Sequence, residues 1–214
     1  KEIEKISEEE SFKGYISDLG GPSANMYRLG GKDIEICKKC KRPTCLHPKI
    51  CPNLNTDHSE VLKLYSAVRK LPFIKKAFIG SGIRYDLATD AYLKEVVKNH
   101  VSGRLKVAPE HTNDVVLNLM RKPSFSLFKE FDKKFNKFNE EFGLKQQLIP
   151  YFISSHPGCK PEHMAELAIE TKKLNFRLEQ VQDFTPTPFT LATEIYYTGI
   201  NPYTMEKVYT AKTA

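Results

Sequence analysis

The stretches KKAFIGSG (75–82) and GRLKVAPEH (103–111) decide the fold. Each is a short apolar or alternating run that ends in small or charged residues, which is typical of a strand followed by a turn. Three further runs have the same form: KGYISDLGG (13–21), QQLIPYFISSHPG (146–158) and FRLEQVQDFTPTP (176–188). We therefore expect five strands.

Helical patterns lie between these runs and predict helices within 56–71, 89–100, 111–122, 124–143 and 160–174. Thr89 and Thr112 are expected as N-caps, and Pro161 belongs in a first helical turn. Phenylalanines recur every three or four residues from Phe125 to Phe142. This spacing favours one buried helix face over a platform for stacking nucleic-acid bases.

Alternating strands and helices predict parallel strands with right-handed crossovers. A (β/α) barrel and an open doubly wound sheet both fit, but no G-x-G-x-x-G motif or P-loop follows a strand, which disfavours nucleotide-binding open sheets. We expect an α/β fold, an incomplete (β/α) barrel, as a single domain over residues 1–214. The chain starts within an apparent helix and stops at VYTAKTA without a stop signal, so we expect both ends to be truncated.

The composition is that of an ordinary globular protein, with 40% hydrophobic and 28% charged residues among 214. No apolar run approaches the roughly 20 residues of a membrane-spanning helix, and the charged N-terminus lacks the apolar core of a signal peptide. We expect a cytoplasmic protein without a membrane partner. A net charge of +7 admits an anionic partner such as nucleic acid, although the basic residues are spread along the chain.

A cysteine-rich segment, residues 22–56, interrupts the alternation after the first strand of this chain. Its spacing is C-x2-C-x4-C-x5-C, formed by Cys37, Cys40, Cys45 and Cys51. In a reducing compartment clustered cysteines favour a metal over disulfides, and four thiolates suit zinc or an iron–sulfur cluster. Two disulfides or free thiols are the alternatives. Such a long insertion at the strand ends of a barrel lies on the functional face.

Polar residues follow every predicted strand, where parallel α/β folds build their sites. Each has a structural alternative, such as a turn glycine or an acid in the first turn of a helix. The chain has no G-x-S-x-G or H-E-x-x-H motif, so the residues alone predict a site without a reaction. The candidates are Asp18, Gly20, Gly21, Ser81, Arg84, Lys106, Glu110, His111, Ser154, Ser155, His156, Gln180, Gln182, Asp183 and Thr185.

Four separated stretches together resemble the YgiQ-type branch of the radical S-adenosylmethionine (SAM) superfamily. They are GYISDLGGPSANMYRLG (14–30), CKKCKRPTCLHPKICPNL (37–54), VAPEHTNDVVLNLMRKP (107–123) and YFISSHPGC (151–159). The resemblance implies a partial (β/α) barrel, S-adenosylmethionine, a 4Fe–4S cluster and an electron donor. It also implies a 5′-deoxyadenosyl radical as the reactive species, with no substrate specified.

One departure concerns the cluster. The superfamily holds it with C-x3-C-x2-C after the first barrel strand, and this chain has no such spacing. The resemblance therefore implies that the first strand and its cluster loop lie upstream of Lys1 and that this chain alone is inactive. The four clustered cysteines are then an auxiliary metal site, with zinc or iron–sulfur, or a structural staple.

The resemblance also carries over cofactor residues. Gly20 and Gly21 match a Gly-Gly element that holds the methionyl amino group, although Pro22 stands where the family has an acid. The fourth barrel strand contacts the ribose or carboxylate, and its candidates here are Lys106 and Glu110. Ser154 falls on the fifth strand, whose usual Gly-x-Ile-x-Gly is not matched, and Gln182 falls on the sixth, which contacts adenine.

Two readings from other classes stay open. A basic α/β domain with a metal-thiolate loop also suits a non-catalytic nucleic-acid-binding protein. A metal-dependent aldolase-type barrel would need Glu110, His111, His156 and Asp183 to converge.

Overall fold

The computed structural model describes residues 1–21, 23–176 and 178–212; Pro22, in the predicted insertion and at the predicted acidic position, lies outside them. We predicted one domain over 1–214, and the chain groups into two compact units. Unit 1 comprises Lys1–Cys40, Pro52–Val107 and Phe131–Leu148. Unit 2 comprises Lys41–Cys51, Ala108–Glu130 and Ile149–Ala214.

Unit 1 holds a parallel pair of very short strands, in which Tyr15 pairs with Lys76 and Ile16 with Ala77. The elements are α1 (Glu2–Ser7), β1 (Tyr15–Ile16), α2 (Ile34–Lys39), α3 (Ser59–Arg69), β2 (Lys76–Ala77) and α4 (Asp90–Asn99), with 3-10 turns at Ala24–Met26 and Tyr85–Leu87. Ile3 of α1 and Val68 of α3 pack with Ile16 and Ala77 of the two strands. The hydroxyls of Tyr65 and Tyr92 lie 3.2 Å apart in the buried contact between α3 and α4.

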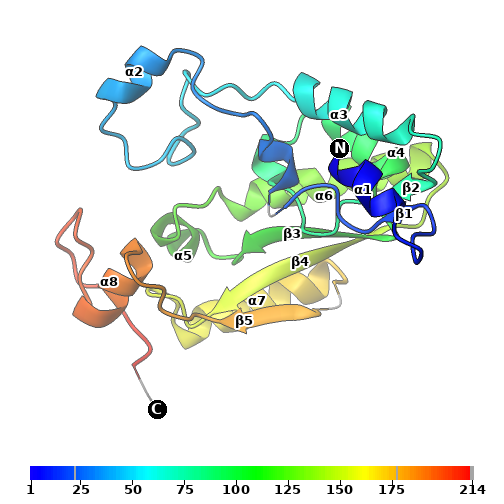
Figure 1. The fold of residues 1–214 in the computed structure, drawn as a ribbon. Coiled ribbons are helices and arrows are strands. Elements are labelled where there is room, and N and C mark those ends of the chain that lie inside the picture. Colours follow the sequence, from blue (N-terminus) through cyan, green and yellow to red (C-terminus); the bar gives the residue numbers. More distant parts are fainter. Residues whose placement is uncertain (22, 177, 213–214) are drawn as a thin grey trace. The chain divides into compact units, whose positions relative to one another are not determined.

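A second sheet has the strand order β3-β4-β5, formed by β3 (Arg104–Glu110), β4 (Gln147–Ser154) and β5 (Gln180–Asp183). Figure 1 shows the three strands side by side. β4 and β5 run parallel, with Ile153 opposite Gln182. Within unit 1 a parallel bridge joins Ile83, after β2, to Val107 of β3. The described residues thus form two small sheets and no closed barrel.

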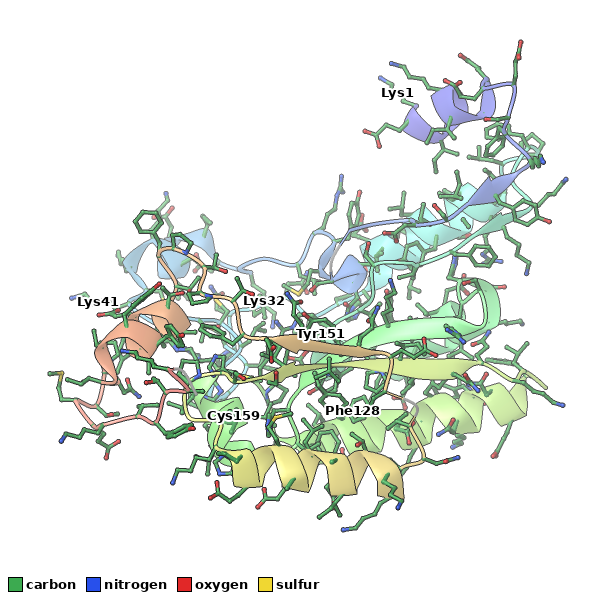
Figure 2. The ribbon with its side chains drawn as sticks, turned by 90° about the horizontal axis from the view of Figure 1, so that it is seen from below. Lys1, Lys32, Lys41, Phe128, Tyr151 and Cys159 are labelled. Carbon is green, nitrogen blue, oxygen red and sulfur yellow. The ribbon has the colours of Figure 1, made fainter. Side chains whose placement is uncertain are left out.

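The helices of the second half are α5 (Asp114–Leu119), α6 (Phe125–Glu141), α7 (Pro161–Lys173) and α8 (Leu191–Thr198). In both views α7 runs along β4 and β5 (Figures 1 and 2). The phenylalanine stripe of α6 is buried from Phe125 to Phe138, each no more than 4% exposed, so the prediction of a packed helix face is confirmed. None of the helices in the described residues is long and apolar enough to cross a membrane.

All five predicted strands and five predicted helices are present, which confirms the α/β class. Thr89 caps α4 by accepting from Tyr92 N–H, as predicted. The N-cap expected at Thr112 is wrong: Asn113 caps α5, because its side-chain oxygen accepts from Val115 N–H at 2.9 Å. The helices α2 and α8 were not predicted.

Candidate functional site

A cavity of about 450 Å³ lies within unit 2 at the carboxyl ends of the strands. Glu110 ends β3, Tyr151 and Ile153 come from β4, and Gln182 and Asp183 end β5. The remaining walls come from the end of α5 and the residues after it, including Arg121 and Lys122, from the predicted residue His156, and from the segment between β5 and the first turn of α8, including Thr187 and Leu191. We call it the strand-end cavity.

Glu110 is the most constrained polar residue of this cavity. His111 N–H donates to the Pro109 carbonyl at 2.9 Å, which closes a three-residue turn around Glu110 with φ 68°. A non-glycine residue in this region is strained, and such strain concentrates at functional sites. One carboxylate oxygen accepts from Lys122 Nζ at 2.8 Å. The other, Oε2, is buried and has no hydrogen-bond partner among the described residues.

Two side-chain pairs line or support the wall formed by β4 and β5. The Tyr151 hydroxyl donates to Gln182 Oε1, which leaves the Gln182 amide hydrogens as donors. Burial and the Glu110 charge raise the pKa of Tyr151, so its hydroxyl stays protonated. Ser154 does not line the cavity, but its hydroxyl donates to Asp183, which does. Tyr151 is labelled in Figure 2.

A buried histidine holds the turn behind Glu110. His111 is fully buried, and its Nδ1 accepts from Asn113 N–H at 2.9 Å. The neutral ring therefore carries its proton on Nε2, which lies 3.5 Å from Cys159 Sγ. Burial, with a smaller contribution from nearby His163, lowers the pKa of His111 to about 4. Because the nitrogen that faces the sulfur is protonated, it is no general base for Cys159. Cys159 is itself buried, as is common for a cysteine that packs as a small apolar side chain.

Three predicted cofactor residues, Gly20, Gly21 and Lys106, belong to unit 1. The Asp18 carboxylate organises the strand ends there, since it accepts from Gly80 N–H at 2.8 Å and from the Ser81 hydroxyl. A Cβ at position 21 would meet no atom within 4 Å, so the backbone there is open to a ligand. The Lys106 side chain is exposed.

The cysteine-rich segment divides between the units. In unit 1, Cys40 N–H donates to the Cys37 carbonyl at 3.1 Å at the end of α2. Asn53 Nδ2 donates to Cys37 Sγ at 3.2 Å, and any side chain at Gly31 would collide with this sulfur. These two contacts hold the Cys37 sulfur in place between the Asn53 amide and the Gly31 backbone.

The other two cysteines belong to unit 2, in the loop Lys41–Cys51, where Cys51 N–H donates to the Cys45 carbonyl at 2.7 Å. No disulfide joins any of the five cysteines, all of which lie among the described residues. Over 1–21, 23–176 and 178–212, no three His, Cys, Asp or Glu side chains are grouped so that they could hold a metal ion. The four-thiolate site therefore stays a prediction.

The same loop reaches the residues beside the strand-end cavity. Burial, with the positive charge of Arg121, lowers the pKa of His47, which also interacts with the backbone of Lys122. His47 thus lies against two residues that line the cavity.

Sequence reasoning missed Tyr151, Arg121 and Lys122. Alternation along β4 was the available signal for Tyr151, because side chains two residues apart share a face and Ile153 also lines the cavity. For Arg121 and Lys122 there was no signal, since the predicted helix included both residues.

Comparisons with known proteins show that the chain is similar to UPF0313 proteins. It is 62% identical over 224 residues to a UPF0313 protein of Bacteroides thetaiotaomicron, covering 99% of this chain and 36% of that protein. It is 61% identical to one of Porphyromonas gingivalis, covering 99% and 35%, and 49% identical to one of Methanocella arvoryzae, covering 99% and 36%. No model of a known protein family matches it. The chain is thus closely similar to UPF0313 proteins and spans about a third of their length.

Proposed function

We propose that the chain forms part of the barrel of a radical S-adenosylmethionine enzyme and that its strand-end cavity takes part in binding the cofactor or the substrate. When bound, S-adenosylmethionine and a reduced 4Fe–4S cluster supply the radical chemistry of such enzymes. The substrate stays open.

The observation that carries the proposal is the environment of Glu110. This carboxylate ends a strand, lies in a strained turn and lines a cavity, and one of its buried oxygens has no hydrogen-bond partner among the residues that the structure describes. Leaving a buried acceptor unpaired is costly, so a ligand that donates a hydrogen bond would relieve the cost. The amino and ribose hydroxyl groups of S-adenosylmethionine are such donors, and the residues fit this ligand.

The side chains of the strand-end cavity would then bind and orient the ligand. Glu110 Oε2 accepts from the ligand while the Lys122 ammonium balances the carboxylate charge. Gln182 offers its amide hydrogens because Tyr151 occupies its oxygen. Leu191, Phe184 and Ile153 supply apolar wall for a ring.

The radical-generating cluster does not fit the residues present, because the chain contains no C-x3-C-x2-C. We assign no step to it here, and other residues of a longer protein would hold it. Cys37, Cys40, Cys45 and Cys51 are our proposed ligands for an auxiliary zinc or iron–sulfur site.

Binding of S-adenosylmethionine tests the proposal. The full-length protein, reconstituted anaerobically with iron and sulfide, is titrated calorimetrically as wild type and as Glu110→Gln. We expect the variant to bind at least about tenfold more weakly, because it loses a charged acceptor. Glu162→Gln, an exposed glutamate on α7 that does not line the cavity, is the matched control. The proposal would be contradicted if the wild type did not bind S-adenosylmethionine, or if Glu110→Gln bound it as tightly as the wild type.

A further inference from the structure

We infer that Arg121 binds an anionic group, a carboxylate or a phosphate, of the ligand in the strand-end cavity. The inference rests on the cavity of the proposed function and adds the chemical class of the ligand group that the cavity recognises.

The backbone position of Arg121 is one that normally belongs to glycine. α5 ends at Leu119, and Arg121 N–H donates to the Asn118 carbonyl at 3.0 Å while Lys122 N–H donates to the Leu117 carbonyl at 2.9 Å. These two bonds form a Schellman motif, whose left-handed residue is usually Gly. Here that residue is Arg121 with φ 56°. Arginine adopts this conformation at a cost in free energy, so the local turn gives no reason for arginine at this position.

The guanidinium also lacks an anionic partner. Over the described ranges 1–21, 23–176 and 178–212, Arg121 forms no ion pair, whereas its neighbour Lys122 is paired with Glu110 at 2.8 Å. Its guanidinium carbon lies 4.6 Å from the centre of the Tyr203 ring. An aromatic ring orients a guanidinium held over its face, and the N–H donors at the edge of the guanidinium stay available for a carboxylate or phosphate.

Partial burial strengthens this reading. Arg121 is only part-exposed, which reduces the screening of its charge by water. A bidentate anion is the group that best matches a planar, unpaired guanidinium in a cavity wall.

Two sources could supply the anion: the carboxylate of S-adenosylmethionine, or an anionic group of the substrate. Arg121→Gly is the decisive variant, because glycine suits the left-handed position and the variant is expected to fold. Met205→Gly is the matched control, since Met205 has φ 59°, is 72% exposed and does not line the cavity.

Equilibrium dialysis of the full-length, anaerobically reconstituted protein measures binding of three probes: S-adenosylmethionine, 5′-methylthioadenosine, which lacks the carboxylate, and inorganic phosphate. If the cofactor supplies the anion, Arg121→Gly weakens the binding of S-adenosylmethionine at least about tenfold and leaves the binding of methylthioadenosine unchanged. If the substrate supplies it, the wild type binds phosphate saturably, the variant loses this binding, and S-adenosylmethionine is unaffected.

Equal binding of S-adenosylmethionine and of phosphate by wild type and Arg121→Gly, or a lack of phosphate binding together with unchanged S-adenosylmethionine binding, would overturn the inference. Failure of the proposed function has a different signature: no S-adenosylmethionine binds, while the phosphate arm still reports on Arg121.

Discussion

His111 should make stability fall as the pH is lowered, and the size of the effect follows from its burial. Its folded-state pKa of about 4 lies below the ordinary value of 6.5. Between these values the unfolded chain binds a proton that the folded chain does not, so this contribution is complete above pH 6.5 and declines as the pH falls towards 4. From about pH 7.5 to about pH 5 the wild type should lose roughly 2 kcal/mol through this residue alone.

Urea unfolding of the purified protein at both pH values measures this loss. His111→Asn is the comparison, because asparagine keeps a polar atom near the position of Nδ1, which accepts from Asn113 N–H, and does not titrate. Burial also lowers the pKa of His58, His100 and His156, so the variant keeps part of the slope. The difference between the two proteins isolates His111. If the wild type and His111→Asn lose the same stability, the hypothesis that His111 is buried as a neutral imidazole is wrong. An NMR titration of the His111 ring would then show a pKa near 6.5.

Two further predictions concern the cysteines and the glycine pair. Cys40→Ser should lower the zinc or iron content of the purified protein and increase hydrogen exchange in residues 30–55 but not in β3 or β4; unchanged metal content and exchange would remove the metal hypothesis. Gly21→Val should weaken S-adenosylmethionine binding in calorimetry without lowering the melting temperature, because a Cβ there meets no atom within 4 Å; unchanged affinity would reduce Gly21 to a turn residue.

Periodicity was sufficient to locate the sheet and most helices, because burial of apolar faces is written into the order of residues. The phenylalanine stripe of α6 is the clearest case. Periodicity could not predict how short β1 and β2 are, since these strands pair over only two residues each. How far two strands pair depends on residues distant in the chain. Local pattern also misplaced one cap, because Asn113 and Thr112 are both good capping residues.

The site divides in the same way. Glu110 could be predicted, since strand ends are where parallel folds place polar groups. The strained turn at Glu110 could not be predicted. It is closed by His111, and the His111 ring packs beside Cys159, which comes from another part of the chain. A cysteine pattern likewise fixes how many ligands a metal could have but not whether they meet. The Asn53 amide and the Gly31 backbone lie against the Cys37 sulfur, and no local pattern in the sequence predicts that these residues meet.

Arg121 shows why sequence and structure must be read together at such a site. In the sequence it is one of 33 basic residues and continues a helical pattern, so nothing separates it from surface charge. In the structure Arg121 occupies the left-handed position of a helix-ending turn, where glycine is usual, and lies over the Tyr203 ring. It lines a cavity beside Glu110, whose carboxylate is already paired with Lys122. Each feature alone has an ordinary structural explanation. Their coincidence in one residue is costly for folding. Because no carboxylate among the described residues pairs with this strained cation, we infer that an anion binds in the cavity wall.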